Sequence, residues 1–102
     1  MNNKINLEGC IVEPNNILAL TSKEGLITEL EEGRFYKFNK NGFLIFPIGK
    51  EMQLRELEID MNEERKIGTL LATIQITHTA QNLLGGIIST SGEYIVKKVI
   101  YK

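Results

Sequence analysis

Hydrophobic and polar residues alternate most clearly between Ile67 and His78. One parity of this segment is apolar and holds Leu70, Ala72, Ile74 and Ile76. The other parity is filled mainly by threonine and glutamine. A period of two residues is typical of a strand that buries one face, so this segment predicts a long β-strand.

The dipeptide Asn41-Gly42 separates two segments that are rich in aromatic and branched residues, Arg34–Phe38 and Phe43–Phe46. Such side chains suit a half-buried pleated surface. Asn-Gly between two strand-like segments is the strongest short-range signal for a β-hairpin. We therefore expect these two segments to pair with each other.

The segment Glu51–Met61 changes its alternation halfway along. Its apolar residues are Met52 and Leu54 on one parity, then Leu57, Ile59 and Met61 on the other. A β-bulge near Arg55 and Glu56 would bring all five to one face. A helix is the alternative, because Glu, Leu, Met and Arg favour helices. Helical spacing leaves Ile59 off the apolar stripe, so the bulged strand is favoured.

The segment Ala80–Ile88 contains Gly85-Gly86 and predicts a loop or a short helical turn before a last strand, Tyr94–Tyr101. The residues around the glycines are apolar: Leu83, Leu84, Ile87 and Ile88. They form either a plug beneath the sheet or an exposed patch, and a patch would mark an interface. The plug is the favoured alternative.

Together these patterns predict an all-β fold. About seven short strands follow one another at intervals of roughly 8–12 residues, which is typical of a small antiparallel barrel or sandwich. The remaining expected strands are Leu7–Val12 and Ile17–Leu20. A chain of 102 residues supports one hydrophobic core, so residues 1–102 are expected to form a single domain.

Composition narrows the classes of function. The formal net charge is -1, from 12 basic and 13 acidic residues, so the overall basic excess of most nucleic-acid binders is missing. One histidine, His78, and one cysteine, Cys10, cannot supply a zinc site, and Cys10 is expected to be a small buried residue. We find no nucleophile–base motif, no cofactor motif, no signal peptide and no apolar membrane span. The chain is therefore expected to be a cytoplasmic protein that is not an enzyme and uses no metal or cofactor.

Three surfaces are candidates for binding. The first is the apolar segment of Leu83, Leu84, Ile87 and Ile88, which would engage a protein partner. The second is a nucleic-acid surface on the expected Arg34–Phe46 hairpin, where aromatic and basic residues interleave, with Arg34, Tyr36, Lys37 and Lys40 as the contacts. The third is a small-ligand site at a barrel mouth, built from Arg55, His78 and Tyr94.

Three short strings carry a resemblance to a known family: Phe43-Leu44-Ile45-Phe46-Pro47-Ile48, Met52-Gln53-Leu54-Arg55 and Ile67-Gly68-Thr69. In this order they resemble a family of small bacterial β-domains of unknown function. The similar part extends from Leu7 to Val99, and this chain has an additional loop at Leu83–Ser91. The resemblance implies a β fold and assigns no functional residues.

The leading hypothesis is a non-enzymatic binding module that engages a cytoplasmic protein. A specific form of it is a regulator or inhibitor encoded by a mobile element. Nucleic-acid binding and a small-ligand site near His78 are the alternatives. Oligomeric state and strand order remain open at this level.

Overall fold

The structure of the chain is a computed structural model. It describes residues 6–7, 10–12, 16–62 and 64–101, and the described side chains begin at residue 16. The described strands are β1 (Asn6–Leu7), β2 (Cys10–Val12), β3 (Ile17–Leu20), β4 (Phe35–Asn41), β5 (Phe43–Ile45), β6 (Glu51–Ile59), β7 (Arg65–Leu84) and β8 (Ile87–Val99). Helical structure in these residues is confined to the short 3-10 turn η1, Ser22–Glu24. The expected all-β fold is confirmed.

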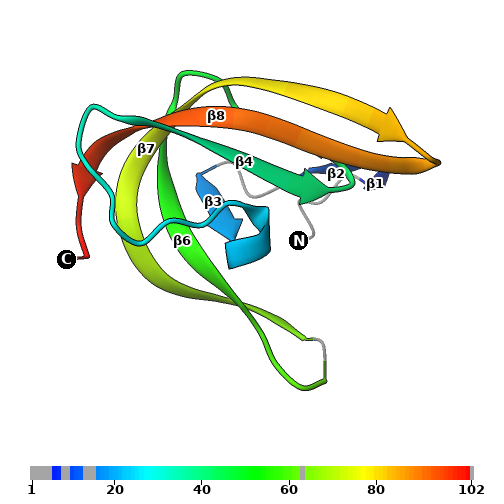
Figure 1. Cartoon of the computed structure of the whole chain (residues 1–102), viewed down its shortest axis with the longest axis horizontal. Coiled ribbons are helices and arrows are strands. Elements are labelled where there is room, and N and C mark those ends of the chain that lie inside the picture. Colours follow the sequence, from blue (N-terminus) through cyan, green and yellow to red (C-terminus); the bar gives the residue numbers. More distant parts are fainter. Residues whose placement is uncertain (1–5, 8–9, 13–15, 63, 102) are drawn as a thin grey trace.

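The strands form two sheets, one of five strands in the order β3-β6-β7-β8-β4 and one of three in the order β1-β2-β5 (Figure 1). The fold differs from a small antiparallel barrel in two respects. First, β3 pairs parallel with β6, and β2 pairs parallel with β5. Second, the larger sheet is strongly curved but open, because no ladder joins its edge strands β3 and β4 in the described residues.

A buried lysine bridges the gap between the two edge strands. Lys40 of β4 is only 4% exposed, and its Nζ donates a hydrogen bond of 2.5 Å to the carbonyl oxygen of Ala19 in β3. The same Nζ lies 3.7 Å from Oε1 of Glu24 in η1. Because an ammonium group is costly to bury without partners, these contacts explain how Lys40 can lie inside the fold. A side-chain contact thus links the two edge strands of the open sheet, where no backbone ladder joins them in the described residues.

The hydrophobic core fills the concave side of the curved sheet. Every strand of this sheet contributes: Leu18, Leu20, Phe38, Met52, Leu54, Ile74, Ile76, Tyr94 and Val96 are all buried. Aromatic rings pack at one end, with Phe38 edge-on to Phe46 at 5.6 Å and Tyr36 stacked on Tyr94 at 5.8 Å between ring centroids. The apolar parity predicted for β7 is confirmed at Ala72, Ile74 and Ile76.

The segment Glu51–Met61 forms a strand, as favoured, and not a helix. Its register against β7 shifts between Leu54 and Arg55 and again between Arg55 and Leu57. These irregularities allow both Leu54 and Leu57 to point into the core. The expectation that all five apolar residues share the buried face is wrong for the last two. Ile59 is 53% exposed and Met61 100% exposed, near the turn where the β6–β7 hairpin extends away from the core (Figure 1).

The hairpin expected between Arg34 and Phe46 does not form. β4 pairs antiparallel with β8, and β5 pairs parallel with β2 in the other sheet. Asn41 remains in the β4–β8 ladder opposite Ser89, so the change of direction falls on Gly42, whose φ is 98°. A two-residue hairpin turn needs both central residues outside the ladder. Here the Asn-Gly signal marks the point where the chain crosses from one sheet to the other.

Candidate interaction surface

The segment predicted to be a loop is instead the end of a long β-hairpin. β7 and β8 pair up to Leu84 opposite Ile87, and only Gly85 and Gly86 lie between them. Both glycines have positive φ, 59° and 79°, as a type I′ turn requires. β4 pairs with β8 only as far as Ser89, so the last residues of the hairpin extend beyond the end of β4 (Figure 1).

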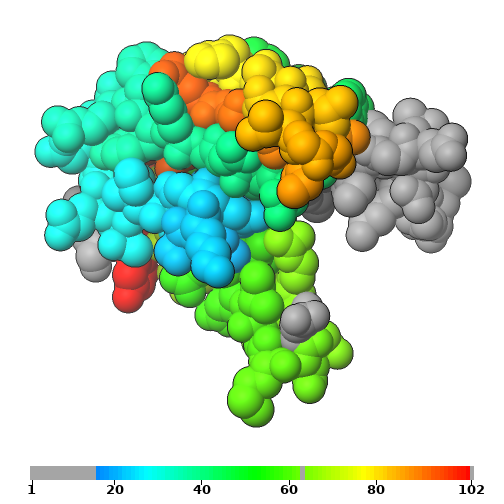
Figure 2. All heavy atoms as spheres, turned by 45° about the vertical axis from the view of Figure 1, so that its right-hand side comes forward, coloured from blue at the N-terminus to red at the C-terminus, as the bar shows by residue number. Residues whose placement is uncertain are grey.

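The four apolar residues of this segment are exposed at the end of the hairpin, and we call them the hairpin tip. Their exposed fractions are 72% for Leu83, 83% for Leu84, 65% for Ile87 and 40% for Ile88. Figure 2 shows the tip, in amber, at the surface of the molecule. The favoured plug is therefore wrong, and the alternative of an exposed patch is correct. A plug would have required a loop free to fold back, whereas paired strands hold these residues away from the core.

Side-chain hydrogen bonds fix the base of the tip. Thr90 is fully buried, and its Oγ1 donates to the Gly42 carbonyl oxygen at 2.8 Å and accepts from the Leu44 backbone N–H at 2.9 Å. Gln81, opposite Thr90, donates from Nε2 to the Leu44 carbonyl oxygen at 3.2 Å. The base of the tip is thus attached to β5, and the apolar tip projects beyond it.

The tip presents one apolar pair to each side of the hairpin. Leu83 pairs with Ile88 on the side that carries Gln81 and Thr90, and Leu84 pairs with Ile87 on the opposite side. Asn41, Ser89 and Lys23 line a shallow depression together with Leu84 and Ile87. On the side of Leu84 and Ile87, the hairpin therefore presents apolar side chains at its end and polar side chains next to them.

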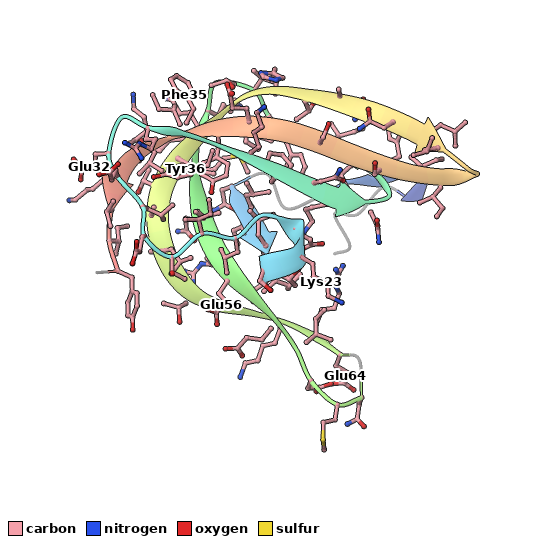
Figure 3. The ribbon with its side chains drawn as sticks, viewed as in Figure 1. Lys23, Glu32, Phe35, Tyr36, Glu56 and Glu64 are labelled. Carbon is pink, nitrogen blue, oxygen red and sulfur yellow. The ribbon has the colours of Figure 1, made fainter. Side chains whose placement is uncertain are left out.

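The residues of the nucleic-acid alternative do not form one exposed surface. Arg34 and Lys37 are exposed, although Arg34 Nη2 lies 2.8 Å from Glu31 Oε2 and forms an ion pair with this carboxylate. Lys40 is buried in the gap between β3 and β4, so it cannot reach a phosphate. Tyr36 points inward from β4 while Phe35 points outward (Figure 3). The stacking platform that this alternative needs is reduced to Phe35 and its basic neighbours.

The residues of the small-ligand alternative do not share one site, because Tyr94 is buried while His78, beside it in the β7–β8 ladder, is exposed. Tyr94 is fully buried in the core, and burial raises the pKa of its hydroxyl well above the ordinary value, with a further contribution from Tyr36. Arg55 donates to the Gly68 carbonyl oxygen at 3.0 Å and to Gln53 Oε1 at 2.9 Å. His78 is exposed on β7. The expected barrel mouth is not formed, since the sheet is open.

His78 does line a depression of about 460 Å³ on the outer side of the sheet, with Lys37, Glu93 and Lys23. Its Nδ1 lies 3.9 Å from Oε1 of Glu93, and Thr77 Oγ1 donates to the same carboxylate at 3.2 Å. A register shift between Ile76 and His78 places Thr77 beside Glu93. This grouping cannot be predicted from the sequence, because it depends on which strands are neighbours.

In the part of the chain that the structure describes, no group of three or more His, Cys, Asp or Glu side chains is placed to hold a metal ion. The same residues include no helix that is long and apolar enough to span a membrane. The side chain of Cys10 lies outside the described residues, so its expected burial stays a prediction.

Comparison with known proteins finds no matching family model, no similar curated protein and no similar solved structure. The resemblance to small bacterial β-domains therefore stays a prediction.

Proposed function

We propose that this protein is a non-enzymatic binding module that engages a protein partner through the hairpin tip. The supporting observation is the exposure of Leu83, Leu84, Ile87 and Ile88 at the end of a hairpin whose base is fixed by Thr90 and Gln81. An anchor whose base is already held in place loses less conformational freedom on binding than a free loop does, which favours affinity.

The partner that fits this tip is a protein surface with an apolar groove. Burying an aliphatic side chain stabilises a complex by about 1.5–3 kcal/mol when it leaves water completely. Leu83 and Ile88 would contact one wall of the groove, and Leu84 and Ile87 the other. A cytoplasmic location and a role as a regulator or inhibitor from a mobile element complete the proposal. These parts rest on the small size and composition of the chain.

The test is capture from lysate of the native host with three forms of the tagged chain. They are the wild type, the double variant Leu84→Asp/Ile87→Asp, and the control Met61→Asp, which changes a fully exposed apolar side chain at the other hairpin. We expect one protein to be retained in stoichiometric amount by the wild type and the control, and lost from the double variant. Equal retention by the double variant, or no stoichiometric protein with the wild type, would contradict the proposal.

A further inference from the structure

The β7–β8 hairpin lies in a long part of the chain that carries no formal charge. From Ile67 to Gly92 there is no Asp, Glu, Lys, Arg or Pro, and His78 is the only titratable side chain. All 25 charged residues of the chain, 12 basic and 13 acidic, therefore lie outside this segment. Such a distribution is unusual for a segment that is largely exposed at its far end.

The same hairpin has an open backbone edge. β6 pairs with β7 only as far as Gln75, and the Gly49 N–H donates to the Ile76 carbonyl oxygen at 2.9 Å. Beyond that point, no described strand covers the outer side of residues Thr77–Leu84. In Figure 1 this part of β7 forms the margin of the sheet. Natural sheets guard such edges with charges, proline or a covering segment, and the first two are missing here.

The turn geometry shows which backbone groups face outward. In a two-residue hairpin, the residues next to the turn, Leu84 and Ile87, exchange hydrogen bonds with each other. The next pair, Leu83 and Ile88, then points its N–H and C=O groups away from the partner strand. This agrees with the Ile88 carbonyl oxygen accepting from the Gly42 N–H across the other edge of β8. On β7 the outward residues are accordingly Leu83, Gln81 and Thr79.

We propose that this edge pairs antiparallel with the same edge of a second copy of the chain, about a two-fold axis at Gln81. In that register Gln81 faces Gln81 of the other copy, and Thr79 faces Leu83. Every outward N–H of these three residues then meets a carbonyl oxygen. The five-stranded sheet continues from one copy into the other.

A second copy suits this edge because the edge is complementary to itself. A two-fold antiparallel pairing brings identical segments together, so any charge near the axis would meet its own kind. The segment Thr77–Leu84 contains no Asp, Glu, Lys or Arg, and therefore avoids this repulsion. The pairing uses backbone groups and leaves the faces of the hairpin open. It goes beyond the proposed function and does not depend on it.

The experiment places charged side chains at the proposed two-fold axis, at position 81. The variants Gln81→Lys and Gln81→Glu each place like charges opposite one another in the dimer, while an equal mixture of the two places opposite charges there. Gln81→Ala is the matched control, because it also removes the hydrogen bond to Leu44 but adds no charge. Analytical ultracentrifugation across a wide range of protein concentrations measures the association of each sample.

We expect the wild type and Gln81→Ala to form dimers, each charged variant alone to associate at least tenfold more weakly, and the mixture to recover the dimer. A monomeric wild type at every concentration would overturn the proposal. So would dimerisation of both charged variants at the wild-type strength, or failure of the mixture to recover it. Loss of partner capture from lysate would contradict only the proposal that the hairpin tip binds a protein. Each of the two proposals can therefore fail without the other.

Discussion

At the scale of single residues, Tyr94 is the least satisfied group of the core. Its side chain is fully buried, and the hydroxyl has no hydrogen-bond partner among the described residues. Its ring is nevertheless well packed, stacked on Tyr36 and tilted against Phe38. A buried hydroxyl without a partner costs about 1–3 kcal/mol of desolvation. The ring therefore contributes packing, while the hydroxyl opposes folding.

We predict that Tyr94→Phe raises the free energy of unfolding by about 1–3 kcal/mol, because it removes the unpaired hydroxyl and keeps the ring. Burial raises the pKa of Tyr94 above its ordinary value of 10.0, so the neutral form is favoured in the folded state. This preference for the neutral form leaves the free energy of unfolding unchanged below pH 10 and lowers it as the pH rises above 10. The wild type should therefore lose more stability than Tyr94→Phe above pH 10. Urea unfolding of both proteins at neutral and alkaline pH measures the difference, and parallel curves would contradict this reasoning.

At the scale of elements, Lys40 provides a side-chain contact between β3 and β4, which no backbone ladder joins in the described residues. Its contacts reach Ala19 in β3 and Glu24 in η1, and Glu24 also accepts a hydrogen bond from the Thr21 N–H at 2.9 Å. Arg65 of β7 lies 3.6 Å from the same carboxylate. Glu24 thus connects η1 to two strands, and Lys40 is the buried member of this group.

We predict that Lys40→Met destabilises the fold by about 3 kcal/mol, since removing one partner of a buried pair leaves the other uncompensated. Glu24→Gln in the same chain should recover part of this loss. A double-mutant cycle by chemical unfolding gives the coupling energy between the two positions. Additive effects of the two substitutions would show that the contact between Lys40 and Glu24 contributes no stability.

Alternation and turn signals predicted individual strands better than strand partners. Ile74 and Ile76 alternate with polar residues because one face of β7 is buried, and burial of one face leaves a mark in the sequence. The sequence pattern does not indicate which strand pairs with β4, because a chain that reaches Asn41-Gly42 can turn back on itself or cross to another sheet. Which strand lies beside β4 depends on the whole core.

The candidate site illustrates the same limit. The apolar character of Leu83 and Ile87 marks them as candidates, but the sequence predicts a loop there, because residues exposed on both sides of a hairpin show no alternation. The Gly85-Gly86 turn between two apolar pairs was the signal that could have revealed the hairpin. The grouping of His78 with Lys37 and Glu93 had no sequence signal, since three strands contribute to the depression.

At the scale of the whole molecule, the core and the hairpin tip are separable. The buried residues lie in the curved part of the sheet, and none of the four tip residues is among them. Because pairing is regular from Ala80 to Leu84, residues can be removed in opposed pairs without changing the register behind them.

We predict that deleting Leu83, Leu84, Ile87 and Ile88, while keeping Gly85-Gly86 as the turn, leaves the fold intact. Asn82 and Ser89, already opposite each other, would then flank the turn. The free energy of unfolding should fall by about 1 kcal/mol, because deleting Ile88 removes the carbonyl oxygen that accepts a hydrogen bond from the Gly42 N–H. Circular dichroism and thermal unfolding measure this, and loss of cooperative unfolding would show that the tip packs against the body after all.

The pairing of β4 with β8 also has a consequence for synthesis on the ribosome. β4 ends at Asn41, and the strand it pairs with begins at Ile87 and ends at Val99. β4 therefore leaves the ribosome well before its partner has been made, and the core cannot close around Phe38 and Tyr94 until then. Non-local pairing of this kind delays folding. Until β8 has been synthesised, the apolar side chains of the first half, such as Leu18 and Phe38, are therefore expected to stay exposed to solvent.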